Sequence, residues 1–383
     1  METHHQREAA SRQAPEQDHA SKASKAATET AAAASAADSA KPVLEYPFES
    51  APEPGKTLEV ADGVLWIRMP MPGSLNHINL WALRDGDGWT IVDTGLRTPE
   101  TTSAWQELLS GSLGGRPITR IIVTHMHPDH VGMAGWLTRR FDCRLWMTRL
   151  EYLTCRVLVA DTGREAPDDG VAFYRRSGWD DEGIENYRTR FGGFGKAVYT
   201  LPDSYRRIVD GETIRIGEYD WRVVVGKGHS PEHACLYCEG LGLLISGDQV
   251  LPRISSNVSV FPTEPDADPL GDWLDSLEKI AREVPDDVLV LPAHNDPFRR
   301  LHARLGGLAR GHHRGLERMR RTLAEPRRAI DMFGALFARK INNEGNLLSM
   351  ATGESIAHLN YLLHRGEIRM QFDEQGVAWY RNT

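Results

Sequence analysis

Three histidines and one aspartate lie within the six residues HMHPDH that span positions 125–130. The run follows a β-branched stretch, residues 118–124, that predicts a short buried strand. Imidazole nitrogens and carboxylate oxygens are the ligand atoms that zinc, iron and manganese take in proteins. A lone H-x-H pair is weak evidence, but H-x-H-x-D-H directly after a predicted strand indicates a metal site.

Three further residues complete a set of candidate metal ligands: His229, Asp248 and His294. Each follows a predicted strand and lies near glycine or proline, and ligands at several strand ends can converge on one site. Taken alone, His229 or His294 would more often be a loop histidine held by a hydrogen bond, but the whole set favours a metal centre. His233, four residues after His229, could line the pocket, but an ordinary residue at the edge of a strand is favoured.

The order of these residues resembles that of the metallo-β-lactamase superfamily, over about residues 58–300. Asp93, in the sequence VDTG, matches the upstream structural aspartate of that family. The resemblance implies an α+β fold, an αββα sandwich, with two divalent metal ions between its sheets. Zinc is the expected metal, and iron and manganese are the alternatives. The implied ligands are His125, His127 and His229 for one ion, Asp129, His130 and His294 for the other, and Asp248 for both.

The chemistry that the resemblance implies is hydrolysis. A water shared by two divalent cations loses a proton near neutral pH and becomes a strong nucleophile, and the same ions polarise a carbonyl or phosphoryl group. Asp129 has an expected catalytic role, orienting the nucleophile or passing a proton to the leaving group. Asp93 is expected to hydrogen-bond within the HMHPDH loop rather than to bind metal. Three residues are candidates for the substrate pocket. Asn76 and His77 lie on a turn that is near the site in the family, and Arg253 lies in a segment expected to form the rim of the pocket.

The fold and the metal ligands do not determine the substrate class, because the superfamily hydrolyses thioesters, lactones, β-lactams and phosphodiesters. Some β-lactamases carry a cysteine at the position of Asp248. The absence of that cysteine here weighs against antibiotic hydrolysis. The insertion and the C-terminal module resemble a thioesterase-like group. We therefore expect hydrolysis of a small-molecule thioester, ester or lactone, in class EC 3.1. A phosphodiesterase or ribonuclease is one alternative, and a mononuclear iron sulfur oxygenase is another, disfavoured because no second-site ligand is missing.

The chain divides into three predicted parts. Residues 1–54 are rich in Ala, Ser, Glu, Gln and Lys and are expected to form a disordered tail, because they cannot bury enough apolar surface. Residues 55–300 are the expected metallo-β-lactamase domain, with an aromatic helical insertion at 150–195 that forms either a satellite core or a lid. Residues 301–383 are expected to be a basic linker helix and a winged-helix-like module that ends in a hairpin.

The expected partner is a small-molecule acyl substrate rather than a nucleic acid. The basic helix, residues 298–323, could bind a phosphate-rich ligand such as coenzyme A or RNA, but the favoured interpretation is that its basic face is solvated. Residues 325–383 balance seven basic against seven acidic residues, unlike a DNA-reading wing. The formal net charge of −8 also gives no reason to expect nucleic acid or an anionic membrane. The C-terminal module is therefore expected to serve packing or a homodimer contact.

The composition is that of a globular protein with a sizeable core: 383 residues, 40% hydrophobic and 26% charged. Four cysteines are too few for a disulfide scaffold, and Cys235 and Cys238 are predicted to pack in a buried strand. No apolar run approaches the roughly 20 residues that span a bilayer, and no secretory signal is recognised. We therefore expect a cytoplasmic protein without a membrane partner.

Overall fold

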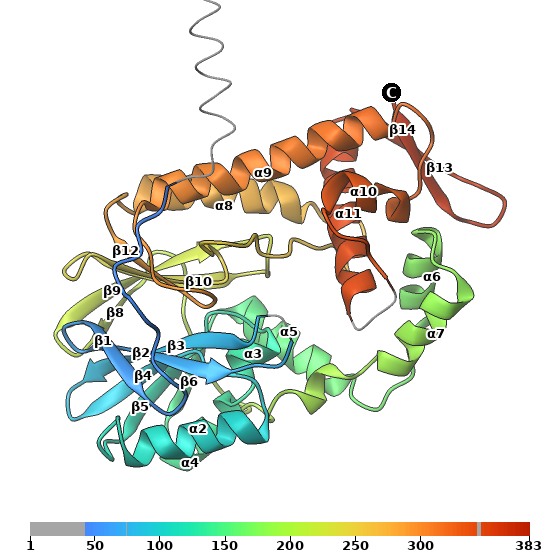
Figure 1. Ribbon diagram of the computed structural model, residues 1–383. Coiled ribbons are helices and arrows are strands. Elements are labelled where there is room, and N and C mark those ends of the chain that lie inside the picture. The colour runs from blue at the N-terminus through green and yellow to red at the C-terminus, as the bar shows by residue number, and fades with distance from the viewer. Residues whose placement is uncertain (1–42, 74, 343–345) are drawn as a thin grey trace, which may run out of the picture. The chain divides into compact units, whose positions relative to one another are not determined.

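Two β-sheets lie face to face, and helices cover the outer face of each, so the layers are α, β, β and α (Figure 1). The computed structural model describes residues 43–73, 75–342 and 346–383. The predicted αββα sandwich is therefore confirmed. Most of the predicted disordered tail, residues 1–42, lies outside the described residues.

The first sheet has seven strands in the described chain, and they follow one another across the sheet in sequence order. Neighbours from β1 to β4 are antiparallel, and neighbours from β4 to β7 are parallel. A two-residue turn joins β3 to β4, at the place where the sequence DGDG predicts it. The strands are β1 (Thr57–Ala61), β2 (Val64–Pro70), β3 (His77–Asp85), β4 (Gly88–Val92), β5 (Ile118–Ile122), β6 (Arg144–Met147) and β7 (Arg206–Arg207).

The second sheet has five strands among the described residues, in the order β12-β11-β10-β9-β8. β8 to β11 pair antiparallel, and β12 joins β11 in parallel. Cys235 and Cys238 are fully buried in β10, so the prediction that they pack as small apolar side chains is confirmed. The strands are β8 (Thr213–Ile216), β9 (Tyr219–Gly226), β10 (His233–Cys238), β11 (Leu243–Gly247) and β12 (Leu289–Pro292).

β2 shows how alternating side chains build a core on each face of the first sheet. Trp66 lies between the two sheets, where its ring stacks on Trp81 with the centroids 6.2 Å apart. Its neighbours Leu65 and Ile67 point to the opposite face and pack with the outer helices. Burying a large apolar side chain stabilises the fold by about 1.5–3 kcal/mol. Apolar burial thus holds the sandwich together, and the strand ends are left to carry polar groups.

Two of the outer helices, α2 and α8, begin at side chains that cap them. Thr98 accepts a hydrogen bond from the N–H of Thr101 at the start of α2, and Asp268 accepts one from Gly271 at the start of α8. The predicted basic helix is α9, which runs along the outer side of the second sheet beside α8 (Figure 1). The helices of these layers and of the HMHPDH loop are α2 (Pro99–Ser110), α3 (Pro128–Val131), α4 (Ala134–Phe141), α8 (Pro269–Glu283) and α9 (Leu301–Thr322).

The aromatic insertion packs against the C-terminal part of the chain, and most of its buried apolar residues join one apolar cluster with α8, α9 and α11 (Leu347–His364). Tyr174 stacks on Trp179 with ring centroids 4.1 Å apart, and the Trp179 indole N–H donates a hydrogen bond to the Thr352 hydroxyl. The second helix, α6, was not recognised in the sequence, because Gly170 and the aspartates before it weaken the helical pattern. The elements are α5 (Arg149–Ala160), α6 (Asp168–Arg176), α7 (Asp181–Arg190) and η1 (Phe194–Lys196).

The C-terminal part consists of helices followed by the predicted hairpin, whose strands pair from Ile368 to Asn382. One of the helices is long, and the two others in the described residues are single turns. Whether the module is a winged helix stays a prediction. The elements are η2 (Ala329–Met332), α10 (Phe333–Leu336), α11 (Leu347–His364), β13 (Ile368–Phe372) and β14 (Ala378–Asn382).

Residues 43–54, which the sequence assigns to the tail, lie on the folded domain. The N–H of Arg299 donates to the carbonyl oxygen of Glu45 at 2.9 Å, and Phe48 packs edge-on against Trp66. The boundary at residue 54 is therefore too late, because the apolar side chains before it find partners. Within the described ranges, no helix is both long and apolar enough to cross a membrane.

Candidate metal centre

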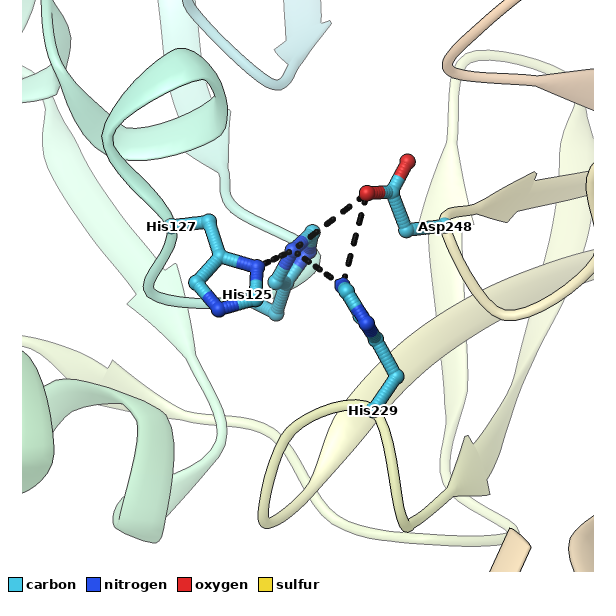
Figure 2. Close-up of side chains that lie close together, drawn as sticks. All are labelled: His125, His127, His229 and Asp248. Atoms are coloured by element: carbon cyan, nitrogen blue, oxygen red, sulfur yellow. Dashed lines mark hydrogen bonds and ion pairs between the residues drawn. The ribbon is translucent and has the colours of Figure 1, made fainter. Parts of the chain in front are cut away.

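Seven side chains converge from loops and turns that follow strands of both sheets. Within each of two groups, the candidate ligand atoms all lie within 4.8 Å of one another. Figure 2 shows two histidines of the loop after β5 facing a histidine that follows β9 and an aspartate that follows β11. The structure therefore brings together every ligand that the sequence proposed. The first group is His125, His127, His229 and Asp248, and the second is Asp129, His130 and His294.

The nitrogens of the first group are spaced as ligands of one ion would be. His125 Nε2 lies 2.8 Å from His127 Nδ1 and 3.3 Å from His229 Nε2. A tetrahedral zinc ion with bonds of about 2.0–2.1 Å places its ligand nitrogens about 3.3 Å apart. The donor set and its spacing thus fit a metal ion.

Asp248 faces both groups with one carboxylate oxygen each. Its Oδ2 lies 3.4 Å from His229 Nε2, and its Oδ1 lies 3.6 Å from His130 Nε2 and 3.5 Å from His294 Nε2. Asp248 Oδ1 and His130 Nε2 are both buried without a hydrogen-bond partner. Such atoms are rare in folded proteins and call for a missing partner. A cation between them supplies that partner, so the second group also fits a metal ion.

Asp93 fixes the HMHPDH loop by hydrogen bonds to Thr124 and His130. Its Oδ1 accepts the N–H of Thr124 at 2.8 Å, and its Oδ2 accepts the Thr124 hydroxyl at 2.9 Å. Oδ2 also lies 2.8 Å from His130 Nδ1, which donates to it. Because the proton of His130 is then on Nδ1, its Nε2 is left as the metal-binding atom.

Two further histidines that present Nε2 to the site, His229 and His294, are oriented by backbone carbonyl groups. His229 Nδ1 donates to the carbonyl oxygen of Asn257 at 2.8 Å, and His294 Nδ1 donates to that of His77 at 2.9 Å. The His77 ring in turn accepts the N–H of Asn295 on Nε2 and donates from Nδ1 to the side chain of Asn76. Asn76 and His77 therefore act on the site through His294.

Arg253 has an exposed side chain, and its place on the rim of the site stays a prediction. Its Nη2 is 3.1 Å from Asp296 Oδ2, and Arg68 Nη2 is 3.1 Å from Asp296 Oδ1. Asp296 comes two residues after His294. The two arginines therefore fix the segment that carries this ligand.

Electrostatics divides the histidines into two kinds. Burial lowers the pKa of His127 to about 3, and burial with the neighbouring imidazoles lowers the pKa of His125 well below its usual value. These rings stay neutral and keep a lone pair for a metal ion. For His130, burial acts against the charged form, but the surrounding carboxylates, Asp93 first, raise the pKa well above its usual value. A divalent cation would take over the charge that this proton supplies.

The site includes two buried residues whose contacts the sequence did not predict. His233 Nε2 accepts the N–H of Asp248 at 3.1 Å, and its ring stacks on His125 with centroids 4.7 Å apart. His233 begins β10, as expected of a residue at the edge of a strand, and its contacts with Asp248 and His125 also make it part of the site. Glu151, on α5, accepts the N–H of Met126 at 2.9 Å and that of Glu232 at 2.8 Å. No local pattern marks it, because both partners are distant in sequence.

The chain is similar to members of the metallo-beta-lactamase superfamily along most of its length. Residues 73–294 match the model described as metallo-beta-lactamase superfamily, and residues 316–383 match that of the metallo-beta-lactamase-like C-terminal domain. The crystal structure of a beta-lactamase domain protein from Burkholderia ambifaria superposes with a TM-score of 0.81 at 40% identity, covering 89% of this chain and 98% of that one.

Two curated relatives carry names that state an activity. A probable metallo-hydrolase of Bacillus subtilis is 26% identical over 311 residues, which cover 79% of this chain and 92% of the relative. An acyl-coenzyme A thioesterase of Homo sapiens is 26% identical over 247 residues, covering 62% of this chain and 80% of the relative. With its sandwich fold and its clusters of histidine and aspartate, the chain belongs to the metallo-β-lactamase superfamily.

Proposed function

We propose that this protein is a dinuclear, zinc-dependent hydrolase that cleaves an acyl thioester. The observation that carries the proposal is the placement of Asp248, whose two oxygens face two separate ligand groups. Two divalent ions, when bound, would activate a water and polarise the scissile carbonyl. The full second group favours this activity over that of a mononuclear iron oxygenase.

Asp129 is the group best placed to move a proton. Its side chain is 19% exposed, more than those of His294 and His130 beside it, so it faces the space that a substrate would enter. Burial would raise its pKa, but His130 and His294 lower it below the usual value. As a carboxylate near neutral pH, Asp129 accepts the proton of the attacking water and passes it to the leaving thiolate.

Support for a thioester comes from the relative named as an acyl-coenzyme A thioesterase. A nuclease is not favoured, because the net charge of −8 and the balanced charges of residues 325–383 give no general reason to expect a nucleic acid as partner. The ester and lactone alternatives share the same carbonyl chemistry and are separated by assay.

The test combines metal analysis with a substrate panel of an acyl thioester, an acyl lactone and bis(p-nitrophenyl) phosphate. We expect about two zinc ions per chain and the highest kcat/KM for the thioester. His127→Ala should remove metal and activity, whereas His313→Ala, an exposed histidine on α9, should change neither. One iron per chain without hydrolysis would overturn the proposal.

A further inference from the structure

A cavity of about 280 Å³ lies between α9, α11 and the segment that follows Asp248. Its wall on α9 is a single stripe of residues three and four positions apart, from Arg304 to Arg318. Gly311 is at the centre of the stripe, and a Cβ added there would meet no atom within 4 Å. The helix therefore leaves room at a place where any larger residue would fill it.

Three guanidinium groups line this cavity: Arg253, Arg304 and Arg318. Arg304 donates to the carbonyl oxygens of Leu251 and Ile254, and Arg318 donates to that of Ala335. A guanidinium carries five N–H donors, so both keep donors to spare. Within the described part of the chain, no carboxylate lies within ion-pair distance of Arg304 or Arg318.

The remaining titratable groups of the cavity do not cancel this charge. Burial lowers the pKa of His312 to about 3 and that of His358 to about 4, so both imidazoles are neutral near pH 7. Burial raises the pKa of Glu354 to about 7, so its carboxyl is only partly ionised there. The cavity is therefore positively charged, and its natural occupant is an anion.

One segment of the chain reaches both the cavity and the metal centre. Asn257 accepts the Nδ1 proton of His229 on its carbonyl oxygen, and its side-chain amide donates to Glu354 Oε2 at 2.8 Å. Arg253, on the same segment, is bound to Asp296, two residues after the ligand His294. The segment of residues 250–257 thus touches metal ligands and also lines the cavity.

We propose that this cavity binds a phosphate group carried on the leaving group of the substrate. The assignment to a substrate group rests on the proposed thioesterase function; the affinity for phosphate follows from the cavity itself. Guanidinium groups match the geometry and charge of phosphate oxygens, and a glycine-lined helix face lets a bulky anion approach closely. A phosphorylated thiol carrier would then be held beside the metal centre while its acyl group is cleaved.

Kinetics on two thioesters of the same acyl group test the substrate role. One is the coenzyme A thioester, which carries phosphates, and the other is the N-acetylcysteamine thioester, which carries none. We expect Gly311→Leu and Arg318→Gln to raise the ratio of KM for the first over KM for the second at least tenfold. Arg321→Gln, an exposed arginine of α9 outside the cavity, is the matched control and should leave the ratio unchanged.

Calorimetric titration of the metal-loaded protein tests binding independently of catalysis, with adenosine 3′,5′-bisphosphate and inorganic phosphate as probes. We expect the bisphosphate to bind the parent protein and Arg321→Gln, and to bind Gly311→Leu and Arg318→Gln at least tenfold more weakly. Thermal unfolding of each variant verifies that it is folded, and leucine in place of glycine favours the helix.

Each outcome has a distinct meaning. If Gly311→Leu and Arg318→Gln weaken the binding of both probes equally and leave the KM ratio unchanged, the cavity binds free phosphate. That result would overturn its proposed role in binding the substrate. Absence of binding by either probe would overturn the inference as a whole. Hydrolysis is judged separately: if neither thioester is cleaved, the proposed function fails, even where the cavity binds phosphate.

Discussion

The Nδ1 atom of His130 lies 2.8 Å from the Oδ2 atom of Asp93, and this contact decides which nitrogen of His130 is left to bind metal. The carboxylate can only accept, so the proton stays on Nδ1 and the lone pair on Nε2. The same carboxylate accepts two hydrogen bonds from Thr124, which fixes the start of the HMHPDH loop. The tautomer and the loop are therefore set by one side chain.

Asp93→Asn should weaken metal binding in the second group. The asparagine amide can donate to His130 Nδ1, which moves the proton to Nε2 and blocks the metal-binding atom. Loss of such a supporting contact typically costs about 10–100-fold in metal affinity. Competition with a chelator measures the affinity. Asp169→Asn, an exposed aspartate of α6, is the control, and equal affinities in the two variants would contradict the assignment.

Glu151→Ala should weaken the metal centre from the opposite side. The change leaves the N–H groups of Met126 and Glu232 buried without acceptors, at a cost of about 1–3 kcal/mol for each. Because these groups lie in the two loops that carry His127 and His229, we expect metal affinity to fall along with the free energy of unfolding. Urea unfolding of the metal-free protein and chelator competition separate the two effects, with Glu182→Ala on α7 as an exposed control. Unchanged metal affinity would reduce Glu151 to a purely structural role.

The predictable part of the site is the part that follows strands. His125 to His130, His229, Asp248 and His294 each come directly after an apolar stretch, so a local pattern locates them. The sheets were predictable for the same reason, since alternation and β-branched runs are local signals. Glu151 was not, because α5 reaches the loop only in the folded chain.

The cavity on α9 shows a second limit of local patterns. The arginines of this helix were recognised, but a solvated face was the favoured interpretation. The structure instead turns Arg304 and Arg318 toward backbone carbonyl groups and a cavity, which depends on the packing of α11 and of the segment after Asp248. The spacing of residues along one helix cannot reveal what packs against it.

Gly247→Ala should disturb the metal centre more than an ordinary glycine replacement does. Gly247 has φ +49, and an added Cβ would lie 2.6 Å from the ring of His233. Gly242 has φ +61, but a Cβ there meets no atom within 4 Å, so Gly242→Ala introduces backbone strain alone. We expect metal affinity to fall in Gly247→Ala and to be kept in Gly242→Ala, as measured by chelator competition. Equal affinities would mean that His233 can move without shifting Asp248.

Glu354→Gln should reveal the titration of a buried carboxyl in the stability of the metal-free protein. Burial raises the pKa of Glu354 to about 7 in the folded state, whereas an unfolded glutamate titrates near pH 4.3. The folded state then holds the proton more tightly, so the contribution of Glu354 is fully present below about pH 4.3 and is lost as the pH rises through about 7. Glutamine keeps an oxygen for the amide of Asn257 but does not titrate.

The parent protein should therefore lose stability relative to Glu354→Gln as the pH rises from about 4.5 to 7, by about 3 kcal/mol at most. The neutral histidines His312 and His358 titrate in both proteins, so their effect cancels in the difference. Urea unfolding at a series of pH values measures it. A difference that does not change with pH would place the Glu354 carboxyl in contact with water, and a difference of opposite sign would require a cation beside it in the folded state.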